Sequence, residues 1–271
     1  MIKPQNLHSH STYCDGTLTL EEMVCAAIEK GCGSFGFSGH SYAPYDVDCC
    51  MSKENTSRYI HEIRDLKEKY SDRIEIFLGI EQDYYAEKTQ GGMDYVIGAV
   101  HYIGKPDELC CIDGGEERQK QACVKYYDGD YYKMAEAYFQ TVSNVAKKTS
   151  ADIVAHFDLI TKYNIGGKLF DENHPLYVKA ALTAMDEILK TCKLFEVNTG
   201  AMYKHGKPSP YPSEFLLKEI NKRGGEVILT SDSHDAGSIC HEFEKTQKML
   251  KSCGFKNMKQ LTVEGFVDVP L

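Results

Sequence analysis

Apolar and polar positions alternate along the chain in the pattern typical of consecutive βα units. The first apolar run ends at Leu7–His8, and a segment of helical periodicity follows it. Its apolar residues recur at helical spacing: Leu20, Met23, Val24, Ala27 and Ile28. Thr19 and Glu22 have capping-box spacing, so we predict a helix that begins after Thr19.

The same alternation continues to the end of the chain. Six further apolar runs predict strands at residues 34–38, 74–80, 95–100, 152–155, 194–197 and 226–230. Intervening segments predict helices at 59–70, 131–146, 178–189 and 214–223, and a closing helix at about 241–252. Seven or eight parallel strands with covering helices make an α/β barrel, although an open doubly wound sheet shows the same alternation.

No linker, low-complexity tract or internal repeat marks a domain boundary, so we expect residues 1–271 to form one domain. Residues 104–129 are polar and charged and lack clear periodicity. We interpret this segment as a long loop or lid over one face.

Composition narrows the class of protein. Hydrophobic residues make up 42% and charged residues 26%, and no apolar run approaches the roughly 18 residues of a membrane span. The N-terminus has no apolar stretch of signal-peptide length, so we expect a cytoplasmic protein without membrane contact. The eleven cysteines include no C-x-x-C, which favours reduced thiols over a disulfide framework. A net charge of -9 argues against binding of extended nucleic acid and leaves a small anionic substrate possible.

Ionisable residues follow almost every predicted strand. They are His8 and His10, then His40, Glu81, His101 and His156, and finally Asp232 with His234. In a barrel these positions meet at the carboxyl ends of the strands, where barrel enzymes place their chemistry. A single histidine after a strand is more often structural, but six of the ten histidines occupy such positions.

Imidazole and carboxylate ligands together suit Zn²⁺, Mn²⁺ or Fe²⁺. This number of candidate ligands exceeds what one tetrahedral ion needs, so we expect two or three divalent ions. A carboxylate such as Glu81 would bridge a pair of ions about 3.5–4 Å apart.

Several short motifs occur together in this order: His8-Ser9-His10-Ser11, Asp15-Gly16, Gly39-His40, Glu81, Ala99-Val100-His101, His156-Phe157-Asp158-Leu159, Glu196-Val197-Asn198-Thr199 and Ser231-Asp232-Ser233-His234-Asp235. Over residues 8–235 the chain therefore resembles the polymerase and histidinol phosphatase (PHP) family. Its length, the Pro210-Tyr211-Pro212-Ser213 segment and the terminal Val-Pro-Leu are similar to those of monofunctional histidinol-phosphate phosphatases.

The resemblance implies a distorted seven-stranded (β/α)7 barrel with a trinuclear metal centre. The first ion would take His8, His10, Glu81 and Asp232; the second would take Glu81, His101 and His156; the third would take Asp15, His40 and His234.

The implied reaction is hydrolysis of L-histidinol phosphate to L-histidinol and phosphate by a metal-activated hydroxide. Asp232 and His234 are the candidates for protonating the leaving alkoxide. Related phosphatases use arginines after the fifth and sixth strands, whereas this chain has Lys162 and Lys204 in the comparable stretches. These lysines either bind the phosphate or are solvated loop residues.

Two other functions are compatible with the sequence. One is a PHP phosphoesterase for nucleotides or short oligonucleotides, in which Tyr126-Tyr127 and Tyr131-Tyr132 would stack on bases. The other is a catalytically silent barrel subunit, for which missing ligands would be the signature; none of the expected positions lacks its ligand.

Overall fold

Seven parallel strands form the central sheet of the computed structural model, which describes residues 3–271. They are β1 (Gln5–Asn6), β2 (Ser34–Phe37), β3 (Glu75–Asp83), β4 (Tyr95–Ala99), β7 (Ile153–Val154), β8 (Leu194–Asn198) and β9 (Glu226–Thr230). Their order in the sheet is their order in the chain, and every neighbouring pair is parallel. All seven predicted strands are confirmed, and β3 extends three residues beyond its predicted end.

The two edge strands meet, so the sheet closes into a barrel instead of remaining open. Ser9, just after β1, pairs with Ser233, just after β9. The Ser233 N–H donates to the His8 carbonyl at 3.0 Å, and the His10 N–H donates to the Ser233 carbonyl at 2.8 Å. These bonds join the first and last strands where the predicted ligands lie.

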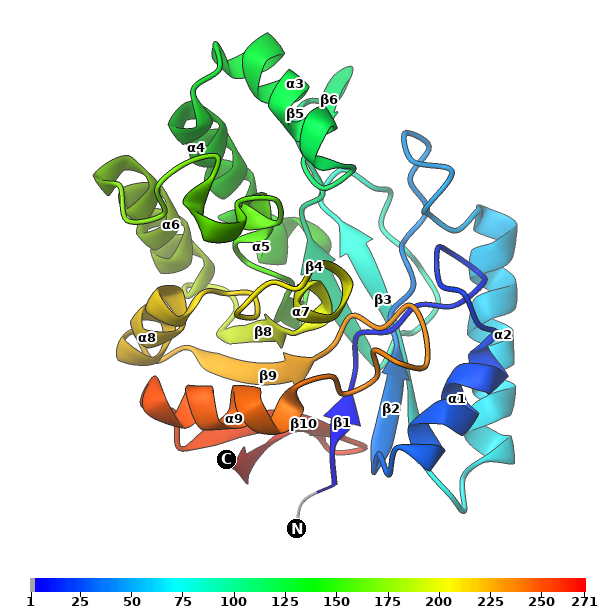
Figure 1. The fold of residues 1–271 in the computed structure, drawn as a ribbon. Coiled ribbons are helices and arrows are strands. Elements are labelled where there is room, and N and C mark those ends of the chain that lie inside the picture. The colour runs from blue at the N-terminus through cyan, green and yellow to red at the C-terminus, as the bar shows by residue number, and fades with distance from the viewer. Residues whose placement is uncertain (1–2) are drawn as a thin grey trace.

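The chain ends in an antiparallel hairpin of β10 (Asn257–Thr262) and β11 (Gly265–Pro270), which the sequence pattern did not predict. The Gln5 side chain accepts from the Leu261 N–H and donates to the Leu261 carbonyl, both at 2.8 Å. The hairpin thereby attaches to β1 at the end of the barrel opposite the closure (Figure 1).

Helices surround the barrel (Figure 1). They are α1 (Leu20–Glu29), α2 (Lys53–Lys69), α3 (Glu116–Tyr127), α4 (Tyr131–Val142), α5 (Val145–Thr149), α6 (Pro175–Ile188), α7 (Gly200–His205), α8 (Glu214–Lys222) and α9 (Phe243–Ser252), with 3-10 turns η1 (Leu159–Thr161) and η2 (Ile165–Gly167). The capping box of Thr19 and Glu22 is present. The helix predicted at 59–70 begins six residues earlier, because Ser52 caps a polar first turn. The helix predicted at 131–146 divides into α4 and α5.

Residues 104–129 have regular structure and are not the irregular loop that we expected. β5 (Tyr102–Lys105) and β6 (Glu108–Cys111) form an antiparallel hairpin, and α3 follows it. Only Gln119, Ala122 and Cys123 of α3 are buried, so its apolar stripe is too narrow to give a clear helical period. The segment leaves the barrel directly after the carboxyl end of β4.

No helix of residues 3–271 is both long and apolar enough to span a bilayer.

Tyr95 fills the barrel interior beneath the rim. Its side chain is 1% exposed, and its hydroxyl donates to the carbonyls of Leu7 and Phe37. Gly79 makes room for the ring, because a Cβ at this position would lie 2.2 Å from the Tyr95 Cζ. Tyr95, which is in β4, thereby contacts β2, β3 and the residue that follows β1.

Replacing Gly79 with alanine should lower the free energy of unfolding by about 2 kcal/mol or more, because the buried Tyr95 ring cannot move aside. Urea denaturation would measure the loss. Gly39→Ala is the matched control, since its Cβ would come no closer than 3.2 Å to a neighbouring atom, the Cys14 Sγ. Equal stability of both variants and the parent would contradict this packing.

Candidate metal centre

All nine predicted ligand residues lie together at the carboxyl rim of the barrel. Each has a side-chain nitrogen or oxygen within 3.6 Å of another member of the set: His8, His10, Asp15, His40, Glu81, His101, His156, Asp232 and His234. They come from segments between residue 8 and residue 234, because parallel strands deliver their carboxyl ends to one rim.

Glu81 is at the centre of the cluster. Its Oε2 lies 3.1 Å from His8 Nε2 and 3.0 Å from His40 Nδ1. Its Oε1 lies 3.0 Å from His156 Nε2 and 3.3 Å from His101 Nε2. Because its two oxygens face different histidines, this carboxylate is placed to bridge two cations.

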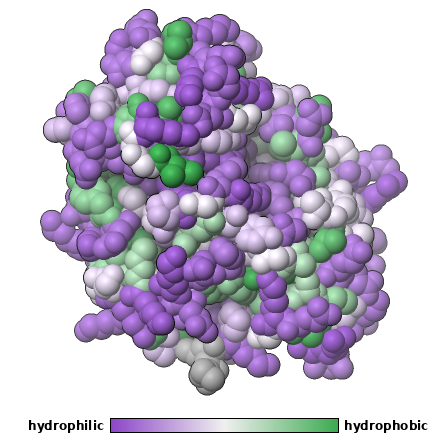
Figure 2. Space-filling view, viewed as in Figure 1, coloured by the Kyte–Doolittle hydropathy of each residue, from purple (hydrophilic) through white to green (hydrophobic). Residues whose placement is uncertain are grey.

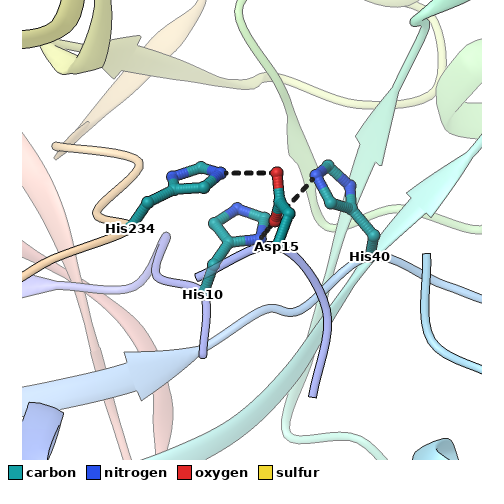
Figure 3. A group of neighbouring side chains, drawn as sticks. All are labelled: His10, Asp15, His40 and His234. Atoms are coloured by element: carbon teal, nitrogen blue, oxygen red, sulfur yellow. Dashed lines mark hydrogen bonds and ion pairs between the residues drawn. The ribbon is translucent and has the colours of Figure 1, made fainter. Parts of the chain in front are cut away.

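Asp15 lies among three further ring contacts, from His10, His40 and His234 (Figure 3). Its Oδ1 lies 3.4 Å from His10 Nδ1 and 3.6 Å from His40 Nε2, and its Oδ2 lies 3.1 Å from His234 Nε2. The chain can turn tightly after Asp15 because Gly16 follows, where a Cβ would lie 2.5 Å from the Ser11 nitrogen.

Asp232 lies between histidines that face Glu81 and histidines that face Asp15. Its Oδ1 lies 3.1 Å from His10 Nε2 and 3.6 Å from both His8 Nε2 and His234 Nδ1. Its φ of 46° is in the left-handed region, which is uncommon for a residue other than glycine. Such backbone conformations occur preferentially at functional sites, where the surroundings hold them.

Four atoms of the cluster are buried and lack a hydrogen-bond partner: His8 Nε2, His10 Nε2, Asp15 Oδ1 and Glu81 Oε2. They approach one another without the alignment that a hydrogen bond requires. Unsatisfied buried polar atoms are rare in proteins, and an ion that accepts their lone pairs would explain these.

Three groups of candidate ligand atoms converge within 4.8 Å: His10, Asp15, His40 and His234; His8, His10 and Asp232; His40, Glu81 and His101. His10 and His40 each belong to two groups. The residues therefore offer room for more than one ion, and their mixture of nitrogen and oxygen donors suits a first-row transition metal or zinc.

The shared environment shifts the pKa values of these histidines in opposite directions. Burial, together with the nearby His234 and His40, lowers the pKa of His10 to about 3. Burial also acts to lower the pKa of His101, but Glu81 and Asp83 outweigh it and raise the value to about 10. His10 is thus a neutral ligand before any ion binds.

Two carboxylates that orient the histidines were not predicted from the sequence. Glu196 in β8 is fully buried and accepts from His8 Nδ1, from the His156 N–H at 2.7 Å and from Thr230 Oγ1 at 2.7 Å. Its place two residues before Asn198, on the same face of a buried strand, was the available signal.

Asp83, at the end of β3, is the second such carboxylate. It lies 3.3 Å from His101 Nδ1 and accepts from the Tyr45 hydroxyl at 2.6 Å. It lies two positions after Glu81 in the same strand, so both side chains point to one side of the sheet.

A cavity of about 230 Å³ opens beside the cluster and includes Asp15, His40 and His101 in its wall. Lys162 also lines it, 3.2 Å from the Asp113 carboxylate. Lys204 is exposed and is not among the lining residues, so the structure places only one of the two predicted lysines there. Figure 2 shows a mainly hydrophilic surface that is hollowed between the α3 side and the α1–α2 side.

Comparison with known proteins agrees with this architecture. The PHP domain model matches residues 6–200. A Deinococcus radiodurans protein named "probable histidinol-phosphatase" is 28% identical over 258 residues, which cover 91% of this chain and 92% of that protein. The histidinol-phosphatase of Bacillus subtilis is 25% identical over 264 residues, covering 88% and 96% of the two chains.

A solved structure shares the fold. The histidinol phosphate phosphatase of Lactococcus lactis, complexed with zinc, L-histidinol and phosphate, superimposes with a TM-score of 0.74 at 19% identity and covers 98% of this chain and 100% of its own. The family match spans well over half of the sequence and the barrel is the same. The chain belongs to the PHP domain family.

Proposed function

We propose that this chain is a metal-dependent phosphomonoesterase that hydrolyses L-histidinol phosphate to L-histidinol and phosphate. The observation that carries the proposal is the set of buried nitrogen and oxygen atoms that converge at the rim without hydrogen-bond partners. The names of the relatives point to the same substrate.

Two or three divalent ions would occupy the cluster, with zinc, manganese and iron all suited to the donors. The first would be held by His8, His10, Glu81 and Asp232; the second by Glu81, His101 and His156; the third by Asp15, His40 and His234. The position of Glu81 among five histidines supports the sharing of this carboxylate by the first two ions.

Bound ions supply Lewis-acid activation of water and of the phosphate oxygens. The residues of the chain contribute position and charge. Asp113 outweighs burial and raises the pKa of Lys162, so this lysine stays protonated beside the cavity. We propose that it contacts the phosphate group, as the sequence suggested; Lys204 remains a candidate only if it moves toward the cavity.

Proton transfer to the leaving alkoxide remains assigned to Asp232 and His234. The Asp232 side chain is 23% exposed, whereas those of His8 and His10 are fully buried. His234 Nδ1 lies 3.6 Å from Asp232 Oδ1. The partial exposure of both side chains, 23% for Asp232 and 12% for His234, supports their access to a substrate.

The two alternative functions receive less support. The tyrosine pairs 126–127 and 131–132 pack against the hydrophobic core and do not line the cavity, so they offer no stacking platform beside the cluster. A silent subunit would have lost ligands, whereas all nine are gathered here. We also propose that residues 1–271 act as one domain in the cytoplasm, which the eleven free cysteines support.

The purified protein, with its metals quantified, should hydrolyse L-histidinol phosphate far faster than nucleotide or sugar phosphates. Chelation should abolish turnover, and zinc, manganese or iron should restore it. Phosphate release measures all of these rates. Comparable rates on every ester would contradict the histidinol phosphate assignment, and no turnover with any metal would contradict the enzyme itself.

Replacing Glu196 with glutamine should weaken metal binding by about 10- to 100-fold, because an amide cannot accept from His8, Thr230 and the His156 N–H together. Competition with a chromogenic chelator would measure the affinity. Glu187→Gln on the exposed face of α6 is the matched control. Unaltered affinity in the Glu196 variant would show that this carboxylate does not orient the ligands.

A further inference from the structure

The cavity beside the metal centre contains few cations for a site that would receive a phosphate dianion. Its charged side chains outside the histidines are Asp15, Asp46, Asp83, Asp113, Arg118 and Lys162. Lys162 Nζ lies 3.2 Å from Asp113 Oδ2, so these two charges largely cancel. Arg118 is therefore the main source of positive charge in this cavity that no carboxylate balances.

Arg118 is on α3, within residues 104–129, for which the sequence pattern predicted no helix or strand. Its side chain is exposed, and it forms no ion pair within residues 3–271, although Glu116 on the same helix binds both Lys120 and Lys168. An arginine in a cavity wall with no carboxylate partner keeps its donors free for an anion.

The backbone that carries Arg118 is firmly held. Gln119 is fully buried, and its Nε2 donates to the carbonyls of Ile112 at 2.9 Å and Ile160 at 3.2 Å. The Tyr163 hydroxyl donates to the Asp113 carbonyl. These bonds fix the start of α3 against the 159–163 turn, which also carries Lys162.

Gly114 gives the Arg118 side chain its place at the cavity. A Cβ at position 114 would lie 3.2 Å from Arg118 Nη1 and 3.3 Å from Arg118 Cδ. The guanidinium group thus lies against a residue without a side chain, and Gly114 itself lines the cavity.

We propose that Arg118 binds the phosphate group of the substrate, extending from α3 toward the metal centre. This inference rests on the proposed function. The planar guanidinium group can donate two parallel hydrogen bonds to phosphate oxygens, which a lysine cannot do. Arg118 then provides the bidentate contact that Lys162 and Lys204, as lysines, do not.

Arg118→Met and Arg118→Lys would test this assignment in the metal-loaded full-length chain. We expect Arg118→Met to weaken binding of inorganic phosphate, measured by calorimetry, and to raise the KM for L-histidinol phosphate, each by about tenfold or more. Arg118→Lys should fall between Arg118→Met and the parent. Metal content should not change, because no predicted ligand contacts Arg118.

Lys125→Met is the matched control, since Lys125 is an exposed cation on the same helix that does not line the cavity. Unchanged phosphate binding and KM in Arg118→Met would overturn the assignment, as would an equal loss in Lys125→Met. If the parent binds phosphate but hydrolyses no ester, the proposed function fails, and the calorimetric comparison still decides the role of Arg118.

Discussion

The structure depends on one electrostatic constraint: several buried nitrogen and oxygen atoms converge at the rim without a hydrogen-bond partner. Four such atoms belong to His8, His10, Asp15 and Glu81. Leaving a buried polar group unsatisfied costs about 1–3 kcal/mol. Divalent cations held by these residues would offset that cost, because they accept the lone pairs that no hydrogen-bond donor reaches.

The closed barrel holds these atoms in place. The bridge joins Ser9, which lies between His8 and His10, to Ser233, which lies between Asp232 and His234, so the ligands from both ends of the chain are fixed to each other. Tyr95 fills the space below them. Glu196 and Asp83 hold histidine rings from behind, which sets the nitrogen that each ring presents to an ion.

Much of this could be predicted from the sequence, because strands that are buried on both faces appear as apolar runs and their ends are marked by histidines. The order of the seven strands and the gathering of nine ligand residues both follow from that pattern. The C-terminal hairpin, the β5–β6 hairpin and α3 could not be predicted, because their exposed faces leave little periodicity. Glu196, Asp83 and Arg118 were missed because their roles depend on neighbours that are distant in sequence.

The most direct test of the metal centre is anomalous X-ray scattering from crystals grown with zinc or manganese, recorded on both sides of the absorption edge of the metal. Two or three peaks are expected at the barrel rim, each about 2.0–2.2 Å from the nitrogen or oxygen atoms around Glu81, Asp15 and Asp232. A rim without anomalous peaks in the presence of excess metal would contradict the assignment of these residues as a metal centre.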